Sequence, residues 1–298
     1  MKPEALLEVY DAAYAATYNE RFILPSYARE TVEGELAALR PLLGEGARWL
    51  DVGCGTGYML SQFPGVPRAG LDKSPGMLGE AQRANPDALF LQEGDFRDAH
   101  PEWREAWSLV SCMWGAYIYV DSVAEVEQVV ANLIAWTQPG GHVYLPVIDG
   151  EDMSRPMPKY EEVVIGFGGL TRMVASVWDW HEYETGQLHK QLISPHPDHL
   201  LRLMAPHFEH LELLRFPVPA PEWPSRKAIL ASGRRAQPNP AQPATITYQS
   251  IPSSPFLPAE LTPQDQAAKL PYQVLIAELA QRFRPAHLLP ALKRRLGM

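Results

Sequence analysis

The residues best suited to chemistry in this sequence are glycines and acids that follow strand-like segments. Asp51-Val-Gly-Cys-Gly-Thr-Gly57 places three glycines two positions apart, within the apolar stretch that begins at Trp49. Glycine has no Cβ, so it lets the backbone turn sharply and lets a ligand lie against main-chain N–H groups. The pattern therefore predicts a strand, a tight turn and a helix start that together bind a nucleotide-like ligand.

Further polar and aromatic residues follow the next strand-like segments. Asp72 lies about twenty residues after the glycines, where a carboxylate can accept two hydrogen bonds from a ribose diol. Gly94-Asp95-Phe96 follows the third segment and pairs an acid with an aromatic edge suited to an adenine. Met113 and Trp114 lie at the end of the fourth segment, and Gln138-Pro-Gly-Gly141 forms a turn that leads into the fifth. Parallel strands end at one edge of a sheet, so we expect these residues to meet there.

The elements that must position these residues alternate between strand-like and helix-like segments, which predicts a parallel sheet covered on both faces. The strand candidates are 47–52, 68–71, 88–92, 108–113 and 141–148, and the helix candidates are 27–43, 57–63, 75–84 and 123–137. Ligands of open α/β sheets bind at the carboxyl edge, so this architecture favours a small-molecule site.

Composition sets limits on the class of protein. The chain has 298 residues, 46% of them hydrophobic, which predicts one α/β core with an appendage. No apolar run approaches the ~18 residues of a membrane span and no signal peptide is evident, so we expect a cytoplasmic enzyme without integral membrane contact. The net charge of −9 argues against nucleic-acid binding. Cys54 and Cys112 lack disulfide or zinc spacing and are expected to pack.

In their order and spacing, four motifs resemble the signature of class I S-adenosylmethionine-dependent methyltransferases: Asp51–Gly57, Leu71-Asp-Lys-Ser-Pro-Gly-Met-Leu78, Gly94–Phe96 and Gln138–Gly141. A fold that binds NAD also uses a glycine triplet. Its GxGxxG pattern is absent here, because Tyr58 and Met59 follow Gly57.

The resemblance covers 47–148 well and extends loosely to 235. It implies a doubly wound, Rossmann-like, seven-stranded, mostly parallel sheet that ends in an antiparallel pair over 208–216 and 227–233. We expect three regions: an N-terminal helical cap over 1–46, a methyltransferase domain over 47–235, and a Pro-rich plus helical extension over 236–298. Within the methyltransferase domain, we expect an antiparallel substrate arm at 149–203, after the fifth strand.

The resemblance also implies which residues hold S-adenosylmethionine. Asp51 with Gly53, Gly55 and Gly57 would hold the amino-acid end of the cofactor, and Asp72 would hold its ribose. Lys73 or Met77 would border the adenine, and Asp95 would accept a hydrogen bond from the adenine amino group, with Phe96 beside the ring. Met113 and Trp114 would line the channel near the sulfonium methyl. A carboxylate that pins the loop is the alternative for Asp51, and the two roles are compatible.

Three tyrosines lie before this domain at a spacing of four. Tyr10, Tyr14 and Tyr18 therefore share one stripe of a helix. In one interpretation the helix packs its tyrosines on the core. In the other it is a cap whose hydroxyls reach cofactor or substrate, since a buried tyrosine usually hydrogen-bonds its O–H.

The methyl acceptor is expected on the substrate arm. Alternation places Trp178, Trp180, Glu182 and Glu184 on one face of a strand and Val177, Asp179, His181 and Tyr183 on the other, with a turn at Thr185-Gly186 and a returning strand over 187–194. His181 is the first candidate for a general base, because its unperturbed pKa near 6.5 suits proton transfer at neutral pH. An exposed strand histidine is the alternative interpretation.

Other candidates complete the prediction of the site. His189, Asp179 and Tyr117 are reserve candidates for the catalytic base. Four further histidines, His196, His199, His207 and His210, lack an evident acidic third ligand, so we expect surface residues and no metal site.

The sequence predicts methyl transfer to a small polar molecule of sugar or natural-product type, with a hydroxyl acceptor slightly preferred over an amine. Met113-Trp-Gly-Ala-Tyr117 departs from the Asn/Asp-Pro-Pro-Tyr of resembling nucleic-acid methyltransferases, which disfavours DNA and RNA. The alternatives are an NAD-dependent oxidoreductase and a non-catalytic scaffold. The apolar segment 264–283 and basic end 292–296 leave open docking on this chain, a homodimer, a partner enzyme or a membrane surface.

Overall fold

The computed structural model describes residues 9–148, 163–165, 169–171, 174–182, 185–217 and 226–251. Its main strands are β1 Trp49–Val52, β2 Arg68–Asp72, β3 Phe90–Glu93, β4 Trp107–Ser111, β5 Thr137–Val147, β10 Phe208–Phe216, β11 Arg226–Arg234 and β12 Thr245–Ser250. Its helices are α2 Ala12–Tyr18, α3 Ser26–Leu39, α4 Tyr58–Ser61, α5 Pro75–Ala84, α6 Val123–Trp136 and α8 Pro197–Met204. Short turns of helix are η1 Asn19–Ile23, η2 Arg40–Leu42, η3 Pro101–Trp103 and η4 Met113–Ile118.

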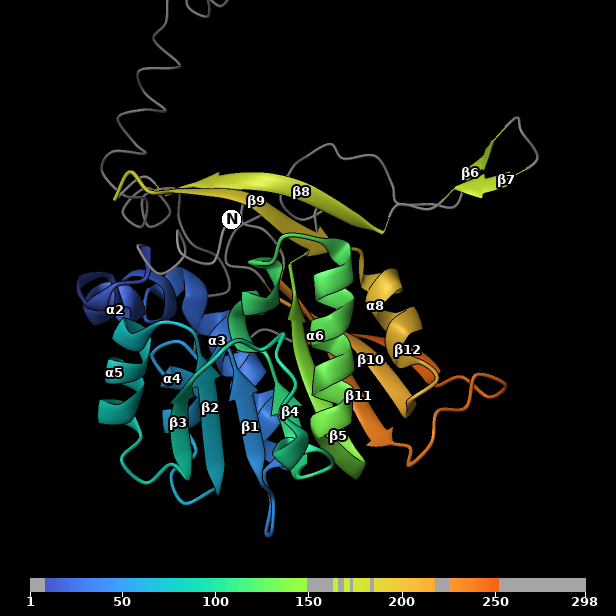
Figure 1. The fold of residues 1–298 in the computed structure, drawn as a ribbon, viewed down its shortest axis with the longest axis horizontal. Helices are drawn as coiled ribbons and strands as arrows, with labels where there is room; N and C mark the ends of the chain where they lie inside the picture. The colour runs from blue at the N-terminus through green and yellow to red at the C-terminus, as the bar shows by residue number, and fades with distance from the viewer. Residues whose placement is uncertain are drawn as a thin grey trace, which may run out of the picture.

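The main strands form one sheet in the order β12-β10-β11-β5-β4-β1-β2-β3 (Figure 1). The strands β1 to β5 are parallel to their neighbours among themselves, so their carboxyl ends meet at one edge, as predicted. β11 runs antiparallel to both β5 and β10, which confirms the predicted final pair. The doubly wound α/β architecture is therefore confirmed.

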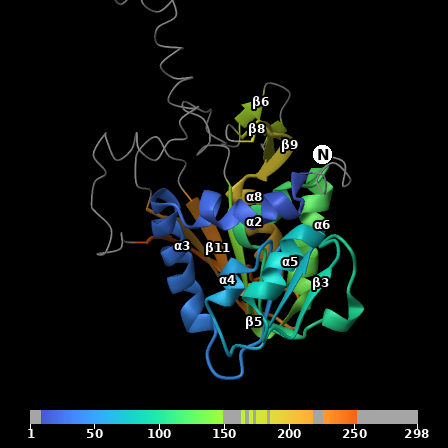
Figure 2. The same ribbon diagram turned by 90° about the vertical axis from the view of Figure 1, so that its left-hand side faces the viewer.

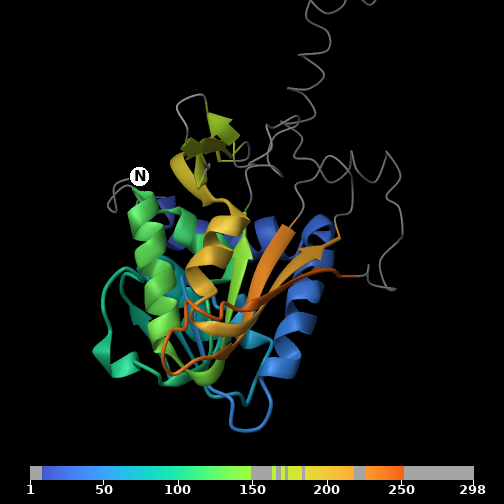
Figure 3. The same ribbon diagram turned by 90° about the vertical axis from the view of Figure 1, so that its right-hand side faces the viewer.

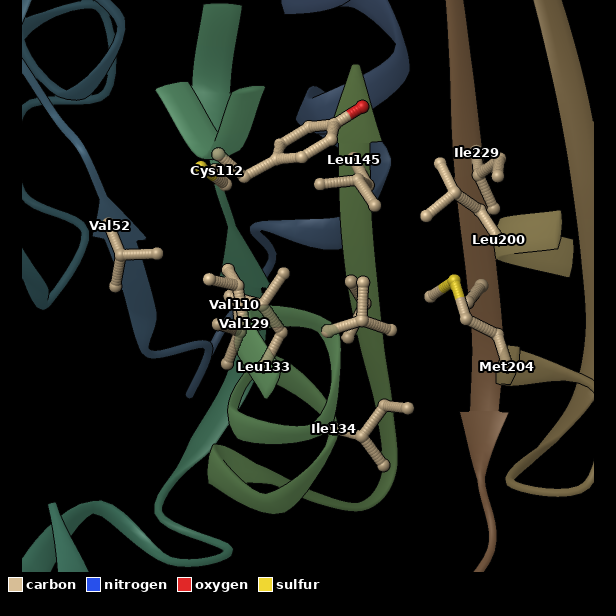
Figure 4. Close-up of a cluster of buried hydrophobic side chains, with 14 of the residues drawn as sticks. Val52, Val110, Cys112, Val129, Leu133, Ile134, Leu145, Leu200, Met204 and Ile229 are labelled. Carbon is tan, nitrogen blue, oxygen red and sulfur yellow. The ribbon is translucent and has the colours of Figure 1, made fainter. Parts of the chain in front are cut away.

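Both faces of the sheet are buried, because helices lie on each side (Figure 3). On the side of α6 and α8, Val129 and Leu133 pack among Val110, Leu145 and other strand residues (Figure 4). On the opposite side α3 covers a cluster around Trp49 and Tyr144. Each large apolar side chain buried in these clusters stabilises the fold by roughly 1.5–3 kcal/mol.

The sheet has eight strands, so the predicted number of seven is wrong. The extra strand is β12, which pairs parallel to β10 from the Pro-rich stretch expected to be extended or irregular. Its alternating Thr-Ile-Thr-Tyr pattern suits a strand. All six of its residues are exposed, so no buried apolar run marked it in the sequence.

Element boundaries differ modestly from the prediction. The helix expected over 27–43 ends at Leu39, because Pro41 lacks an N–H and disfavours helix continuation. The helix after the glycines is one short turn, α4. Cys54 and Cys112 are buried free thiols that pack on opposite faces of the sheet, as expected.

The substrate arm contains a hairpin of β8 Ala175–His181 and β9 Leu188–Pro195. Figure 1 shows this hairpin crossing above the edge at which the parallel strands end. A second small hairpin, β6 Val163–Ile165 with β7 Gly169–Thr171, was not predicted. Tyr183, Glu184 and the segments 264–283 and 292–296 lie outside the described residues. Among the helices described, none combines the length and apolar character needed to cross a membrane.

Candidate functional site

The glycine loop lies at the carboxyl end of β1, and its three glycines have different reasons to be glycine. All three have positive φ, +66° at Gly53, +55° at Gly55 and +67° at Gly57. A Cβ on Gly53 would collide with Ala116, and one on Gly57 would lie 2.6 Å from Nδ2 of Asn85. A Cβ on Gly55 would meet nothing within 4 Å. Packing thus requires Gly53 and Gly57, whereas Gly55 faces open space in which a ligand can lie.

Asp72 at the end of β2 faces this loop. Its Oδ2 accepts a 2.7 Å hydrogen bond from the N–H of Gly55, and its Oδ1 accepts one of 2.9 Å from the N–H of Ser74. Burial raises the pKa of Asp72, and these hydrogen bonds oppose that rise. A carboxylate has about four acceptor positions, so lone pairs remain for ribose hydroxyls. The open space at Gly55 beside this acceptor fits the nucleoside of the cofactor that the resemblance implies.

Asp51 pins the loop to the neighbouring strand. Its carboxylate is almost fully buried, and Oδ1 accepts hydrogen bonds from Oγ of Ser111 at 2.7 Å and from the N–H of Met113 at 3.1 Å. Burial raises the pKa of Asp51 to about 7, while the Ser111 hydrogen bond opposes the rise. The pinning role is confirmed. Contact with the amino-acid end of a cofactor stays a prediction.

Asp95 is already surrounded by donors, which does not fit its predicted contact with adenine. Arg97 and Lys73 form ion pairs with its Oδ2 at 2.6 and 2.9 Å, and Arg97 donates from its main chain and Nε to Oδ1. Burial alone would raise the pKa of Asp95, but these hydrogen bonds outweigh it and lower the pKa. The carboxylate therefore fixes the loop and holds Lys73 in an ion pair, and contact of Lys73 with an adenine stays a prediction.

The other predicted cofactor residues differ in exposure. Met77 and Met113 are almost fully buried, whereas Phe96 and Trp114 are half-buried at the sheet edge. The guanidinium of Arg226 lies 4.2 Å from the centre of the Trp114 ring. Trp114 has a φ of +59°, an uncommon conformation for a bulky residue that often accompanies a functional site.

The N-terminal helix lies above the glycine loop. Thr56 donates a 2.7 Å hydrogen bond to Oδ1 of Asn19, and Ser74 donates to the carbonyl of Tyr10. Figure 2 shows α2 lying across the end of α5. A Cβ on Gly76 would touch the backbone of Asp11, so this glycine permits the close approach of the two helices.

Six residues from distant parts of the chain form what we call the cap–arm cluster: Tyr10, Tyr14, Arg21, Tyr119, Glu182 and His189. Tyr14 donates to Oε2 of Glu182 at 2.9 Å, and Arg21 forms an ion pair with the same carboxylate. Tyr10 donates to the Tyr119 hydroxyl at 2.9 Å, which lies 3.4 Å from Nδ1 of His189.

The cluster shows where two of the stripe tyrosines direct their hydroxyls. Tyr10 donates to Tyr119, which directly follows η4, and Tyr14 donates to Glu182 of the arm, so contact of the stripe with cofactor or substrate stays a prediction. Burial raises the pKa of Tyr18 to about 12, an effect that the charge of Arg226 opposes.

The two arm histidines lie in opposite environments. His181 is exposed together with Val177 and Asp179, so the first candidate for the base points away from the sheet edge. His189 is fully buried and stacks on Trp180 with ring centres 4.5 Å apart. Burial and the charge of Arg21 lower the pKa of His189 to about 4, so its ring is neutral near pH 7.

Two further predictions need correction. Tyr117 is fully buried in the core and donates a 2.9 Å hydrogen bond to the carbonyl of Pro146, which removes it from the site. His199 pairs with Glu127 at 2.9 Å and His196 caps α8, so neither is a plain surface residue. Among the described residues, no group of three His, Cys, Asp or Glu could hold a metal ion.

Sequence reasoning missed the roles of Glu182, Tyr119 and Arg21. The only signal for Glu182 was the alternation that placed it on the tryptophan face of the predicted strand, and in the structure it directly follows β8. No local pattern marks Tyr119 or Arg21, because their partners lie about 70 to 160 positions away in the chain.

Comparisons with known proteins agree with this geometry. A family model described as "Methyltransferase domain" matches residues 25–206, more than half of the chain. The chain is 34% identical to a dTDP-3-amino-3,6-dideoxy-alpha-D-glucopyranose N,N-dimethyltransferase of Streptomyces fradiae over 46% of this chain and 51% of that protein. It is 31% identical to a dTDP-4-amino-2,3,4,6-tetradeoxy-D-glucose N,N-dimethyltransferase of Saccharopolyspora spinosa, over 45% and 51%. The chain thus spans about half the length of these relatives.

A solved structure has a similar fold. The glycopeptide N-methyltransferase MtfA, in complex with S-adenosyl-L-homocysteine, superposes with a TM-score of 0.50 at 18% identity. The match covers 70% of this chain and 91% of that one.

Proposed function

Because the chain belongs to the family of methyltransferase domains, we propose that it transfers a methyl group from S-adenosylmethionine to an amino group of a sugar-type small molecule. The observation that supports the choice of cofactor is the open space at Gly55 beside the Asp72 carboxylate. The acceptor class is supported by the two relatives, which are named for N,N-dimethylation of dTDP-linked amino sugars. These names favour an amine over the hydroxyl that the sequence slightly preferred.

The glycine loop and Asp72 would hold the cofactor. Gly55 offers backbone that a ligand can approach closely, and Asp72 would accept hydrogen bonds from the ribose hydroxyls. Met113 and Trp114 would border the reacting end from the end of β4. S-adenosylmethionine supplies a methyl group that is already activated by a sulfonium.

The remaining task of the chain is to position the acceptor and exclude water. Holding two reactants in line can supply much of the rate acceleration, because the entropy of bringing them together is lost on binding. The cap helix α2 and the hairpin β8–β9 are joined through Tyr14 and Glu182, so they would close over the edge together. Trp180 and Phe22, with ring centres 5.9 Å apart, offer an apolar wall for a sugar ring.

Calorimetric titration and a methylation assay test this function. We expect the purified full-length chain to bind S-adenosylhomocysteine and to methylate dTDP-3-amino-3,6-dideoxyglucose, with the product mass rising by one or two methyl groups. Absence of cofactor binding would contradict the enzyme assignment. Binding without methylation of any dTDP-amino sugar would contradict the acceptor class.

The scaffold alternative predicts a different response to truncation. Deletion after Ile251 keeps β12 in the sheet, whereas deletion after Arg235 would remove it. A catalyst truncated after Ile251 is expected to retain methyl transfer, and a scaffold to lose its partner. A cytoplasmic location and association through 252–298, as homodimer or with a partner enzyme, stay predictions.

A further inference from the structure

We propose that Glu182 and His189, which face inward from the arm, form the subsite that receives the amino group of the methyl acceptor. This inference rests on the proposed function and adds to it the residues that distinguish an amine from a hydroxyl. Neither residue belongs to the four sequence motifs, and both come from the hairpin that crosses the cofactor edge.

The first observation is a pair of buried polar groups that do not reach each other. Glu182 is 4% exposed and His189 is fully buried. Nε2 of His189 lies 3.6 Å from Oε2 of Glu182, too far for a hydrogen bond, and it has no other hydrogen-bond partner among the described residues. Buried polar atoms are nearly always hydrogen-bonded, so Nε2 of His189 calls for a further polar partner, which would lie beside both atoms.

The second observation is that polar or charged neighbours contact both groups. Tyr14 and Arg21 contact the Glu182 carboxylate, which stabilises its negative charge. Nδ1 of His189 faces the hydroxyl of Tyr119. In the tautomer with the proton on Nδ1, His189 donates toward this hydroxyl and presents the lone pair of Nε2 to the gap. In this tautomer, which the proposal requires, the subsite offers one carboxylate and one neutral nitrogen acceptor.

These two acceptors suit an amine. A neutral R–NH2 group can donate one N–H to Nε2 of His189 and the other to Glu182, which leaves the nitrogen lone pair free to attack. As the new carbon–nitrogen bond forms and the methyl–sulfur bond breaks, the positive charge moves from sulfur to nitrogen. The product is a methylammonium, R–NH2⁺–CH3, and its charge develops beside the Glu182 carboxylate. Its excess proton leaves to water after release.

A hydroxyl acceptor would use the subsite less well. It has one O–H to donate, so one of the two acceptors would stay without a partner, which costs binding free energy. It also needs a base during the reaction, and a neutral histidine with a lowered pKa is a weak one. The subsite therefore selects for nitrogen.

The test measures sugar binding to protein saturated with S-adenosylhomocysteine, by calorimetry. The probes are dTDP-3-amino-3,6-dideoxyglucose and dTDP-6-deoxyglucose, which differ by an amino group in place of a hydroxyl. We expect the wild-type protein to bind the amine at least about tenfold more tightly, the scale of one hydrogen bond to a charged group. Glu182→Gln and His189→Phe should each reduce that preference to about twofold or less.

Controls separate this subsite from the fold and from the proposed function. Glu45→Gln changes an exposed carboxylate before β1 and should keep the preference. Cofactor affinity and thermal unfolding show whether each variant is folded, and His189→Phe carries the test if Glu182→Gln does not fold. An unchanged preference in folded His189→Phe and Glu182→Gln overturns the subsite alone. Wild-type protein that binds cofactor but neither sugar contradicts the proposed acceptor class and the subsite with it.

Discussion

The main-chain nitrogen of Gly55 donates a 2.7 Å hydrogen bond to Oδ2 of Asp72, which joins the carboxyl ends of β1 and β2. The loop is therefore held in shape before any ligand arrives, and less conformational entropy is lost when a ligand binds. The same carboxylate lies beside the open space at Gly55. One residue thus both shapes the loop and presents acceptors to a ribose.

Replacing Asp72 tests the cofactor site. Asp72→Ala removes a charged acceptor whose hydrogen bonds to a ribose diol are each worth about 1.5–3 kcal/mol. We expect the affinity for S-adenosylhomocysteine, measured by calorimetry, to fall at least about 100-fold. Glu45→Gln serves as the control at an exposed carboxylate. Normal affinity in Asp72→Ala would show that the cofactor binds elsewhere.

Two alanine substitutions distinguish the ligand-facing glycine from a packing glycine. Gly55→Ala adds a Cβ into open space, so it should lower cofactor affinity with a cost in stability of about 1 kcal/mol from the positive φ. Gly57→Ala brings a Cβ against Asn85 and Ala81, so it should lower the melting temperature more. Calorimetric binding and thermal unfolding of both variants check this difference. If the two variants changed cofactor affinity equally and melting temperature equally, the distinction between a ligand-facing and a packing glycine would be contradicted.

The two arm histidines should respond differently to mutation. His181 is exposed on the outer face, so His181→Ala should retain turnover of an amino-sugar substrate within about twofold. His189→Phe should lower kcat/KM at least about tenfold, because it removes the inward nitrogen acceptor and keeps an aromatic ring beside Trp180. Steady-state kinetics of the two variants, with cofactor affinity as the check on folding, decide the matter. Loss of turnover in His181→Ala alone would restore the base predicted from the sequence.

Glu35 in α3 should make stability depend on pH. It is fully buried, and neither carboxylate oxygen has a hydrogen-bond partner within the described part of the chain. Burial raises its pKa from 4.5 to about 7, against the opposing charge of Arg226. The folded protein therefore holds this proton more tightly than the unfolded chain, so Glu35 destabilises the fold increasingly as pH rises from about 4.5 through 7.

Glu35→Gln removes this titration. We expect the variant and the wild type to have similar stability at pH 5. At pH 8 the variant should be more stable, by about 3 kcal/mol on the scale of 1.36 kcal/mol per pKa unit. Denaturant unfolding at both pH values measures the difference. A difference that does not change with pH would contradict the raised pKa.

Much of the fold followed from local patterns in the sequence. The helix Pro75–Ala84 begins after Ser74, whose side chain accepts from the N–H of Met77, and the predicted bounds match the structure. The strands ending at Val52 and Asp72 were predicted within one residue at that end, because they are short apolar runs followed by glycine or acid. Such signals are contained in a few neighbouring residues, so they can be read without the fold.

The partners of charged side chains could not be read in this way. Asp95 has the sequence context of an adenine acceptor, yet Arg97 and Lys73 occupy its oxygens. Lys73 comes from the end of another strand, so its distance to Asp95 depends on how β2 and β3 pair. β12 was missed for a related reason, since an exposed edge strand shows little apolar periodicity.

The sequence by itself determined that glycines and Asp72 meet at the end of a parallel sheet, because strand order and spacing bring them there. Its alternation also predicted that His181 and Glu182 point to opposite faces of the arm, and in the structure His181 is exposed and Glu182 is buried. Only the tertiary structure decided which face turns inward, since that depends on the cap helix that packs against it. The hydrogen bond from Tyr14 to Glu182 spans 168 positions in the chain, and it exists only after α2 and the arm have folded onto the same edge.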